Sequence, residues 1–198
     1  MRIAMALAFP ALWGLAATAA DLVQVLLGPK WKDVAMIVAT LAAVMPLRIA
    51  ISLSTALLFG IGRADQAFRN MVATLVFVAV LLVIGVRWDL AGVCVAWTIA
   101  IPFAFVLALR ASCRHVRIAV SDAMLDVARS AVPALLMVTA CLAIGLILDD
   151  ALPINRLIAV VATGTIVWPL AVVCTSRSMF EELHAAGRDF FGTRAARL

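Results

Sequence analysis

Arg48 combines the residue type and the setting that best suit ligand binding in this chain. It lies within the apolar run 34–60, about 18 Å along a helix from the nearer end of that run. The hydroxyl residues that share its face at helical spacing are Thr40, Ser52 and Thr55. A guanidinium flanked by hydroxyls suits a phosphate or pyrophosphate group, which it binds by bidentate, charge-assisted hydrogen bonds. We therefore take Arg48, Ser52 and Thr55 as candidate substrate-binding residues.

A second role for Arg48 is equally open at this stage, because a deep arginine can also hold helices together. In that role it would pair with a carboxylate or with helix carbonyls of a neighbouring helix. Asp21 is the only acidic residue inside an apolar run. It fits either a proton or cation site or a carboxylate at the membrane interface.

The sequence predicts no enzyme, no metal site and no cofactor. His115 and His184 lie in basic segments without the neighbours that a metal site or a nucleophile–base pair needs. The motifs HExxH, GxSxG, GxGxxG and the P-loop are absent from the sequence. The cysteines show no metal or redox spacing, and we interpret them as small apolar residues: Cys94, Cys113, Cys141 and Cys174.

The composition requires lipid as the solvent for most of the chain. Of its 198 residues, 66% are apolar, where a soluble domain has about 45–50%, and the mean hydropathy is +1.16. Only 14% are charged, too few to cover a water-soluble core of this size. The net charge of +5 comes from basic residues placed between the apolar runs, so nucleic acid is not an expected partner.

These apolar runs predict an all-α, polytopic bundle of about six transmembrane helices in a single domain. Runs of this length and continuity exclude the alternating strands of a membrane barrel. The predicted spans are 3–27, 34–60, 69–86, 90–109, 131–148 and 157–175. Two further segments carry apolar anchors among charges, and each fits either an interfacial helix or a solvated connector: the amphipathic segment 116–130 and the tail 176–198.

The distribution of basic residues predicts that both termini are cytoplasmic. Eleven lie on the predicted side of the termini, namely Arg2, Arg63, Arg69, Arg110, Arg114, Arg117, Arg129, Arg177, Arg188, Arg194 and Arg197. Four lie on the opposite side, namely Lys30, Lys32, Arg87 and Arg156. Excess Lys and Arg marks the cytoplasmic face of a membrane protein. Trp31 and Trp88 fall at the predicted outer interface, where indoles are enriched.

Three short stretches resemble a known transporter family. They are Val25–Trp31 (VLLGPKW), Leu57–Asp65 (LLFGIGRAD) and Leu90–Trp97 (LAGVCVAW), with Arg48 between the first two. Together they resemble the C-terminal half of polysaccharide and lipopolysaccharide O-antigen flippases, in the multidrug/oligosaccharidyl-lipid/polysaccharide exporter superfamily. The motifs are short, although the resemblance covers nearly the whole chain as an arrangement of helices.

This resemblance implies a function and its partners. Members of that superfamily have two lobes of helices around a central cavity, and they carry an undecaprenyl-pyrophosphate-linked glycan across the bacterial inner membrane by alternating access. The chain would supply one lobe, and the other would come from a missing N-terminal part or a second polypeptide. Carried over to this sequence, Arg48 becomes a cavity residue for the pyrophosphate or an acidic sugar.

Two alternatives from other classes compete with the transporter. A small integral-membrane interaction or assembly subunit needs no cavity and would use Arg48 as an interhelical pin. An integral-membrane transferase for a lipid-linked sugar is the weaker alternative, because the predicted outer loops lack acidic or histidine clusters.

Overall fold

The fold is an all-α bundle, as the sequence predicts. The computed structural model describes residues 2–116, 119–148 and 152–175, and every regular element in them is a helix. The long helices are α1 (Arg2–Leu27), α2 (Lys32–Gly60), α3 (Ala64–Gly85), α4 (Asp89–Val116), α5 (Val120–Ile147) and α6 (Pro153–Thr175). Short 3-10 helices, η1 (Pro29–Trp31) and η2 (Val86–Trp88), join α1 to α2 and α3 to α4.

Length and composition make this a multi-pass membrane protein. Five segments of the described chain are long and apolar enough to cross a bilayer: Ile3–Leu27, Pro29–Gly60, Ala64–His115, Val120–Ile147 and Pro153–Cys174. The third segment, 52 residues long, contains both α3 and α4, which fold back on each other at η2. A total of six crossings stays a prediction.

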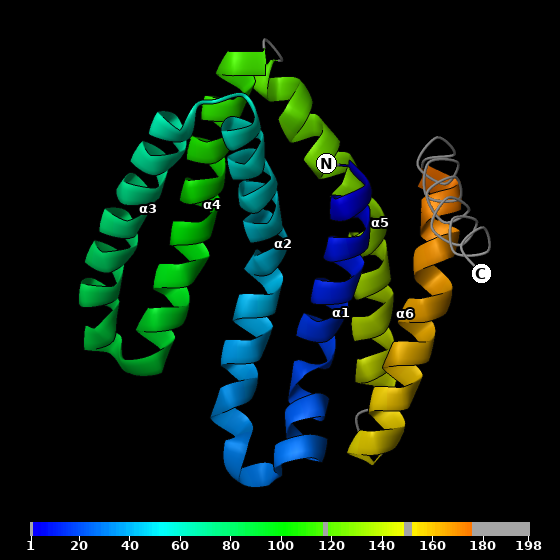
Figure 1. Ribbon diagram of the computed structural model, residues 1–198. Helices are drawn as coiled ribbons and strands as arrows, with labels where there is room; N and C mark the ends of the chain where they lie inside the picture. The colour runs from blue at the N-terminus through cyan, green and yellow to red at the C-terminus, as the bar shows by residue number, and fades with distance from the viewer. Residues whose placement is uncertain (1, 117–118, 149–151, 176–198) are drawn as a thin grey trace, which may run out of the picture.

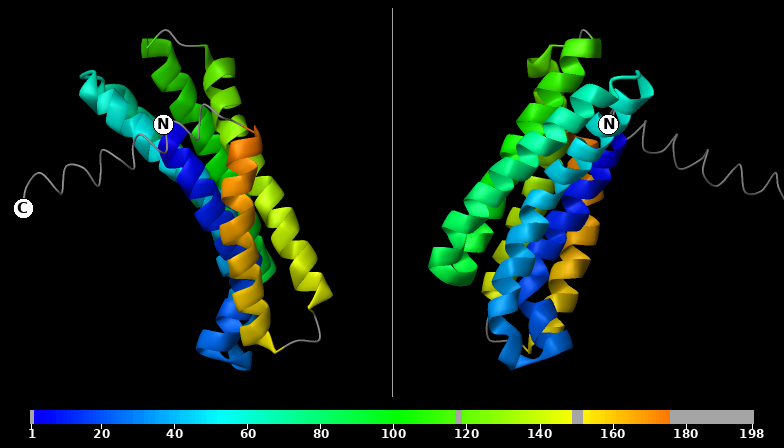
Figure 2. Two further views of the ribbon diagram at one scale, coloured as in Figure 1. Left: turned by 90° about the vertical axis from the view of Figure 1, so that its right-hand side faces the viewer. Right: turned by 60° about the vertical axis from the view of Figure 1, so that its left-hand side comes forward.

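Four helices converge on the main core. Figure 1 shows the helices side by side across the view in the order α3, α4, α2, α1, α5, α6. Helices α1, α2, α4 and α5 supply the buried residues of the core, which are Met5, Phe9, Ala50, Phe105, Leu109, Cys113, Val127 and Ala134. Helix α3 packs on α4, and α6 packs on α5 and α1, so these two helices flank the core (Figure 2).

Polar contacts between helices supplement the apolar packing. The indole nitrogen of Trp13 on α1 donates to the carbonyl of Ala43 on α2 at 2.9 Å. The hydroxyl of Ser112 on α4 donates to the carbonyl of Ser54 on α2 at 3.2 Å. Small and hydroxyl-bearing residues are typical of helix interfaces in lipid, where the backbones approach closely.

Helix α5 differs from the boundaries expected from the sequence. The sequence separates an amphipathic segment at 116–130 from a span at 131–148, but α5 runs without a break from Val120 to Ile147. Pro133 lies inside this helix and is buried. The placement of 116–130 at the membrane surface stays a prediction, and the tail 176–198 lies outside the described residues.

The turn between α3 and α4 depends on two glycines in direct contact. A Cβ atom built on Gly92 would lie 1.9 Å from the carbonyl oxygen of Gly85, and one built on Gly85 would lie 2.6 Å from that of Gly92. Backbone atoms occupy both positions, so no side-chain movement can make room. The two helices therefore approach here as closely as only glycine allows.

We expect Gly92→Ala to destabilise the protein by about 1–3 kcal/mol, since the α3–α4 hairpin must open to admit the methyl group. Thermal unfolding in detergent, followed by helical circular dichroism, measures the effect. Gly145→Ala is the matched control, because a Cβ atom there would lie 4.0 Å from Val160, an ordinary contact. Equal melting temperatures for Gly92→Ala and the unmodified protein would contradict the close approach of the two helices.

Candidate functional site

Arg48 lies on the exposed face of α2, away from the core. Ala50, two residues further along the helix, is fully buried in the main core, and a step of two residues turns a helix by about 200°. The guanidinium of Arg48 makes no hydrogen bond, ion pair or ring contact with any other residue in the described part of the chain. The described residues therefore provide no partner for this charge at the middle of an apolar helix.

The hydroxyls predicted to assist Arg48 donate to their own helix. Ser52 donates to the carbonyl of Arg48 at 3.1 Å, and Thr55 donates to that of Ile51 at 2.9 Å. Thr40 bonds in the same way to Met36, at 2.7 Å. This bonding to the preceding turn is the usual way in which an apolar helix satisfies a hydroxyl. Each oxygen still has acceptor capacity, so a donating ligand group could reach it.

Asp21 and Arg156 form an ion pair that joins α1 to α6. The Arg156 Nε lies 2.8 Å from one carboxylate oxygen of Asp21 and 3.0 Å from the other, and Nη2 also contacts the carboxylate. Asp21 is only 5% exposed, whereas the Arg156 side chain is 23% exposed. Two guanidinium nitrogens thus donate to a nearly buried carboxylate, with Nε reaching both oxygens and Nη2 reaching Oδ1, and hydrogen bonds between two charged groups are stronger than neutral ones.

This pair gives a structural role to both residues. Sequence reasoning left the role of Asp21 open and did not single out Arg156. Asp21 is not an isolated carboxylate, because it has a cationic partner on α6, and its place at the membrane interface stays a prediction. The arginine that pins two helices together is Arg156, and the sequence places it only in an outer connection. The available signal was that Asp21 and Arg156 carry opposite charges toward the same predicted side of the membrane, but the adjacency of α1 and α6 was not predictable.

The remaining candidates for chemistry are the two histidines and the four cysteines. The ring nitrogen Nδ1 of His115 lies 2.8 Å from the carbonyl of Ala111, to which it donates. All four cysteines are free, and Cys174 is the exposed one. Among the described residues no group of three His, Cys, Asp or Glu could hold a metal ion. His184 lies outside the described residues.

Comparison of the chain with protein-family models, with curated proteins and with solved structures finds no match.

Proposed function

We propose that the chain is one lobe, the C-terminal portion, of a transporter that moves a lipid-linked polysaccharide precursor across the bacterial inner membrane by alternating access. The expected cargo is an undecaprenyl-pyrophosphate-linked glycan of the kind that serves lipopolysaccharide or exopolysaccharide synthesis. A second lobe, on the same polypeptide or on another, would complete the cavity. The resemblance of three stretches to polysaccharide flippases supports the proposal.

The exposed and unpaired state of Arg48 carries the argument. An arginine at the centre of a membrane helix costs about 2.5–3.5 kcal/mol on insertion scales, and more on an isolated helix in simulations. Such a charge faces a partner or a water-filled cavity rather than lipid tails. Because the described residues offer Arg48 no partner, the face of α2 that bears it would line a polar space or meet a second lobe.

The chemistry of this face fits a pyrophosphate headgroup. A guanidinium presents parallel N–H donors that match two phosphate oxygens, and a low dielectric strengthens the interaction. In this proposal Arg48 binds the headgroup while the cavity opens to one side of the membrane and then to the other. The experiment that separates this role from an assembly role is glycan export by variants of Arg48, with the amount of inserted protein measured in parallel.

Both termini are placed in the cytoplasm in this proposal, in agreement with the excess of basic residues at one end of the bundle. The start of α1, the α2–α3 turn and the junction of α4 with α5 lie at the upper end in Figure 1, and η1 lies at the lower end. The exposed basic residues of the upper end include Arg63, Arg69, Arg110 and Arg114, and those of the lower end include Lys30, Lys32 and Arg87.

Cysteine labelling tests this orientation. We expect a reagent that cannot cross the membrane to label a single cysteine at Lys30 in intact cells, and to label one at Arg114 only after the cells are broken. Both positions are exposed in the structure, so accessibility depends on the side of the membrane. The control is the same protein with the four native cysteines replaced and none added. Labelling at Arg114 but not Lys30 in intact cells would reverse the orientation.

A further inference from the structure

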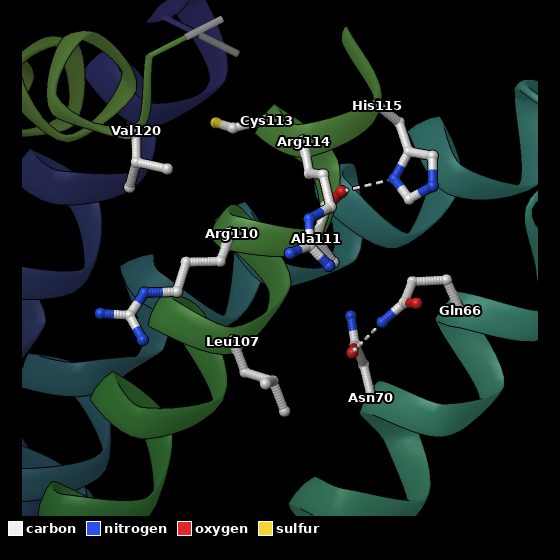
Figure 3. Close-up of a pocket in the computed structure, with 9 residues that line it drawn as sticks. All are labelled: Gln66, Asn70, Leu107, Arg110, Ala111, Cys113, Arg114, His115 and Val120. Carbon is white, nitrogen blue, oxygen red and sulfur yellow. Dashed lines mark hydrogen bonds between the residues drawn. The ribbon is translucent and has the colours of Figure 1, made fainter. Parts of the chain in front are cut away.

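A half-open pocket of about 460 Å³ lies between α3 and α4 at the end of the bundle that carries the α2–α3 turn. Its volume falls within the range of about 300–1,000 Å³ that small-molecule sites occupy. Figure 3 shows Gln66 and Asn70 of α3 on one side of it and Arg110 on the other, with Arg114 between them.

The pocket is cationic. Arg110 and Arg114 lie one helical turn apart on α4, and none of the described residues that line the pocket is acidic. Within the described residues neither guanidinium has a carboxylate partner. Two like charges at this spacing repel each other on a helix, so their placement favours an anion that both can approach.

An unpartnered donor also lines the pocket. The side-chain carbonyl of Asn70 accepts a hydrogen bond from the Gln66 amide at 3.1 Å, which leaves the amide nitrogen of Asn70 to donate elsewhere. That nitrogen is shielded from solvent and has no hydrogen-bond partner in the described part of the chain. A buried donor without a partner costs about 1–3 kcal/mol, so an acceptor that reaches the Asn70 nitrogen would remove this penalty.

The pocket lies where the helices pass from apolar to polar surroundings. Gln66 and Asn70 belong to the first turns of α3, and Arg110 and Arg114 belong to the last turns of α4. On α3 the large apolar side chains Phe68, Met71 and Leu75 are exposed beside this level, as is expected of a surface that meets lipid tails. A ligand with an anionic head and apolar tails matches both surfaces.

We propose that this pocket binds the phosphate group of a lipid headgroup. Arg114 and Arg110 supply the charge, and the Asn70 amide nitrogen donates the additional hydrogen bond. Basic pockets between membrane helices are suited to anionic headgroups, which they bind through the same charge-assisted contacts. The inference does not depend on transport through Arg48, because it concerns different residues at the end of the bundle.

Lipid retention by the purified chain tests the proposal. The chain is placed in nanodiscs of phosphatidylcholine alone, in nanodiscs of equal parts phosphatidylcholine and phosphatidylglycerol, or in phosphatidylcholine nanodiscs containing undecaprenyl pyrophosphate. Native mass spectrometry then counts the lipids that the released protein keeps. Inorganic pyrophosphate, added without an anionic lipid, serves as the soluble probe. We expect retention of phosphatidylglycerol or of undecaprenyl pyrophosphate, and either result supports a lipid phosphate site.

Variants show whether retention depends on the pocket. Arg110→Gln combined with Arg114→Gln should weaken retention at least about tenfold, and Asn70→Asp should do so by placing a negative charge in the pocket. Arg69→Gln is the charge-matched control for Asn70→Asp, because each lowers the net charge by one and Arg69 is exposed at the same end of α3 without lining the pocket. Helical circular dichroism and gel filtration confirm folding.

Two results would overturn the proposal. Equal loss of retention in Arg69→Gln and in Asn70→Asp would mean that the lipids respond to overall charge. Retention of inorganic pyrophosphate but of neither lipid would mean that no headgroup binds. Pocket variants that lose lipid but still export glycan would leave the proposed transport role of Arg48 intact, so the two ideas can fail separately.

Discussion

Arg48→Leu is expected to abolish export of the lipid-linked glycan, while the amount of inserted protein stays normal or rises. Removing the only cation at the middle of α2 would remove the contact to pyrophosphate. It would also lower the insertion cost of the helix, because leucine favours the membrane centre where arginine costs about 2.5–3.5 kcal/mol. The block in export is measured in the same cells as a loss of surface polysaccharide and an accumulation of the lipid-linked precursor in the lipid extract.

Two further substitutions refine this result. Arg48→Lys keeps the charge but loses the planar fork, so export should fall to an intermediate level. Ser52→Ala should change export little, since the Ser52 proton is donated to the backbone of its own helix. Arg63→Leu is the matched control, because Arg63 is an exposed arginine in the turn after α2 and lies outside the apolar helix.

The Arg48 experiment has two outcomes that contradict the transport role. Export at the unmodified rate by Arg48→Leu would exclude Arg48 as a substrate ligand. Failure of that variant to accumulate, with rescue by loss of a carboxylate elsewhere, would make Arg48 a structural pin in an assembly subunit. Within the described chain, the acidic residue predicted inside a span, Asp21, already pairs with Arg156, so the rescuing carboxylate would have to lie outside the contacts described.

The sequence predicts the elements of this fold better than their contacts. Continuous apolar runs are visible without an alignment, and each predicted span overlaps a helix of the structure. The end of a helix in a polar stretch is harder to predict, because charged residues at helical spacing are equally compatible with a continuing helix and with a connecting segment. For that reason the predicted boundary at 130/131 falls inside α5, where Val127 and Ser130 are both buried.

The depth of Arg48 follows from its position in the apolar run, but its exposure does not. A lone sequence does not show which face of α2 meets α1 and α4, and burial of Ala50 decides that Arg48 points elsewhere. For the hydroxyls of Ser52 and Thr55, the face of the helix is predictable but the hydrogen bonds are not. Their shared face with Arg48 follows from spacing, whereas their bonding to the preceding turn depends on side-chain rotation that spacing does not fix.

Asp21→Ala is expected to lower the free energy of unfolding by about 3 kcal/mol, because it leaves the Arg156 guanidinium without its nearly buried carboxylate. The value lies at the low end for a buried pair because the Arg156 side chain is 23% exposed and water reaches it. Unfolding in mixed detergent micelles, followed by helical circular dichroism, measures the change. Asp33→Ala is the matched control, since Asp33 is an exposed aspartate in the first turn of α2 at the same end.

A double-mutant cycle separates the ion pair from the effects of each residue alone. If the two charges act on each other, Asp21→Ala with Arg156→Gln should destabilise less than the sum of the single variants, by about 1–2 kcal/mol. Strict additivity would mean that Asp21 and Arg156 stabilise the fold independently and that the contact is incidental. The cycle also bears on Arg48. A measurable coupling between Asp21 and Arg156 would show that Asp21 is committed to Arg156. A partner for Arg48 would then have to come from outside the described contacts.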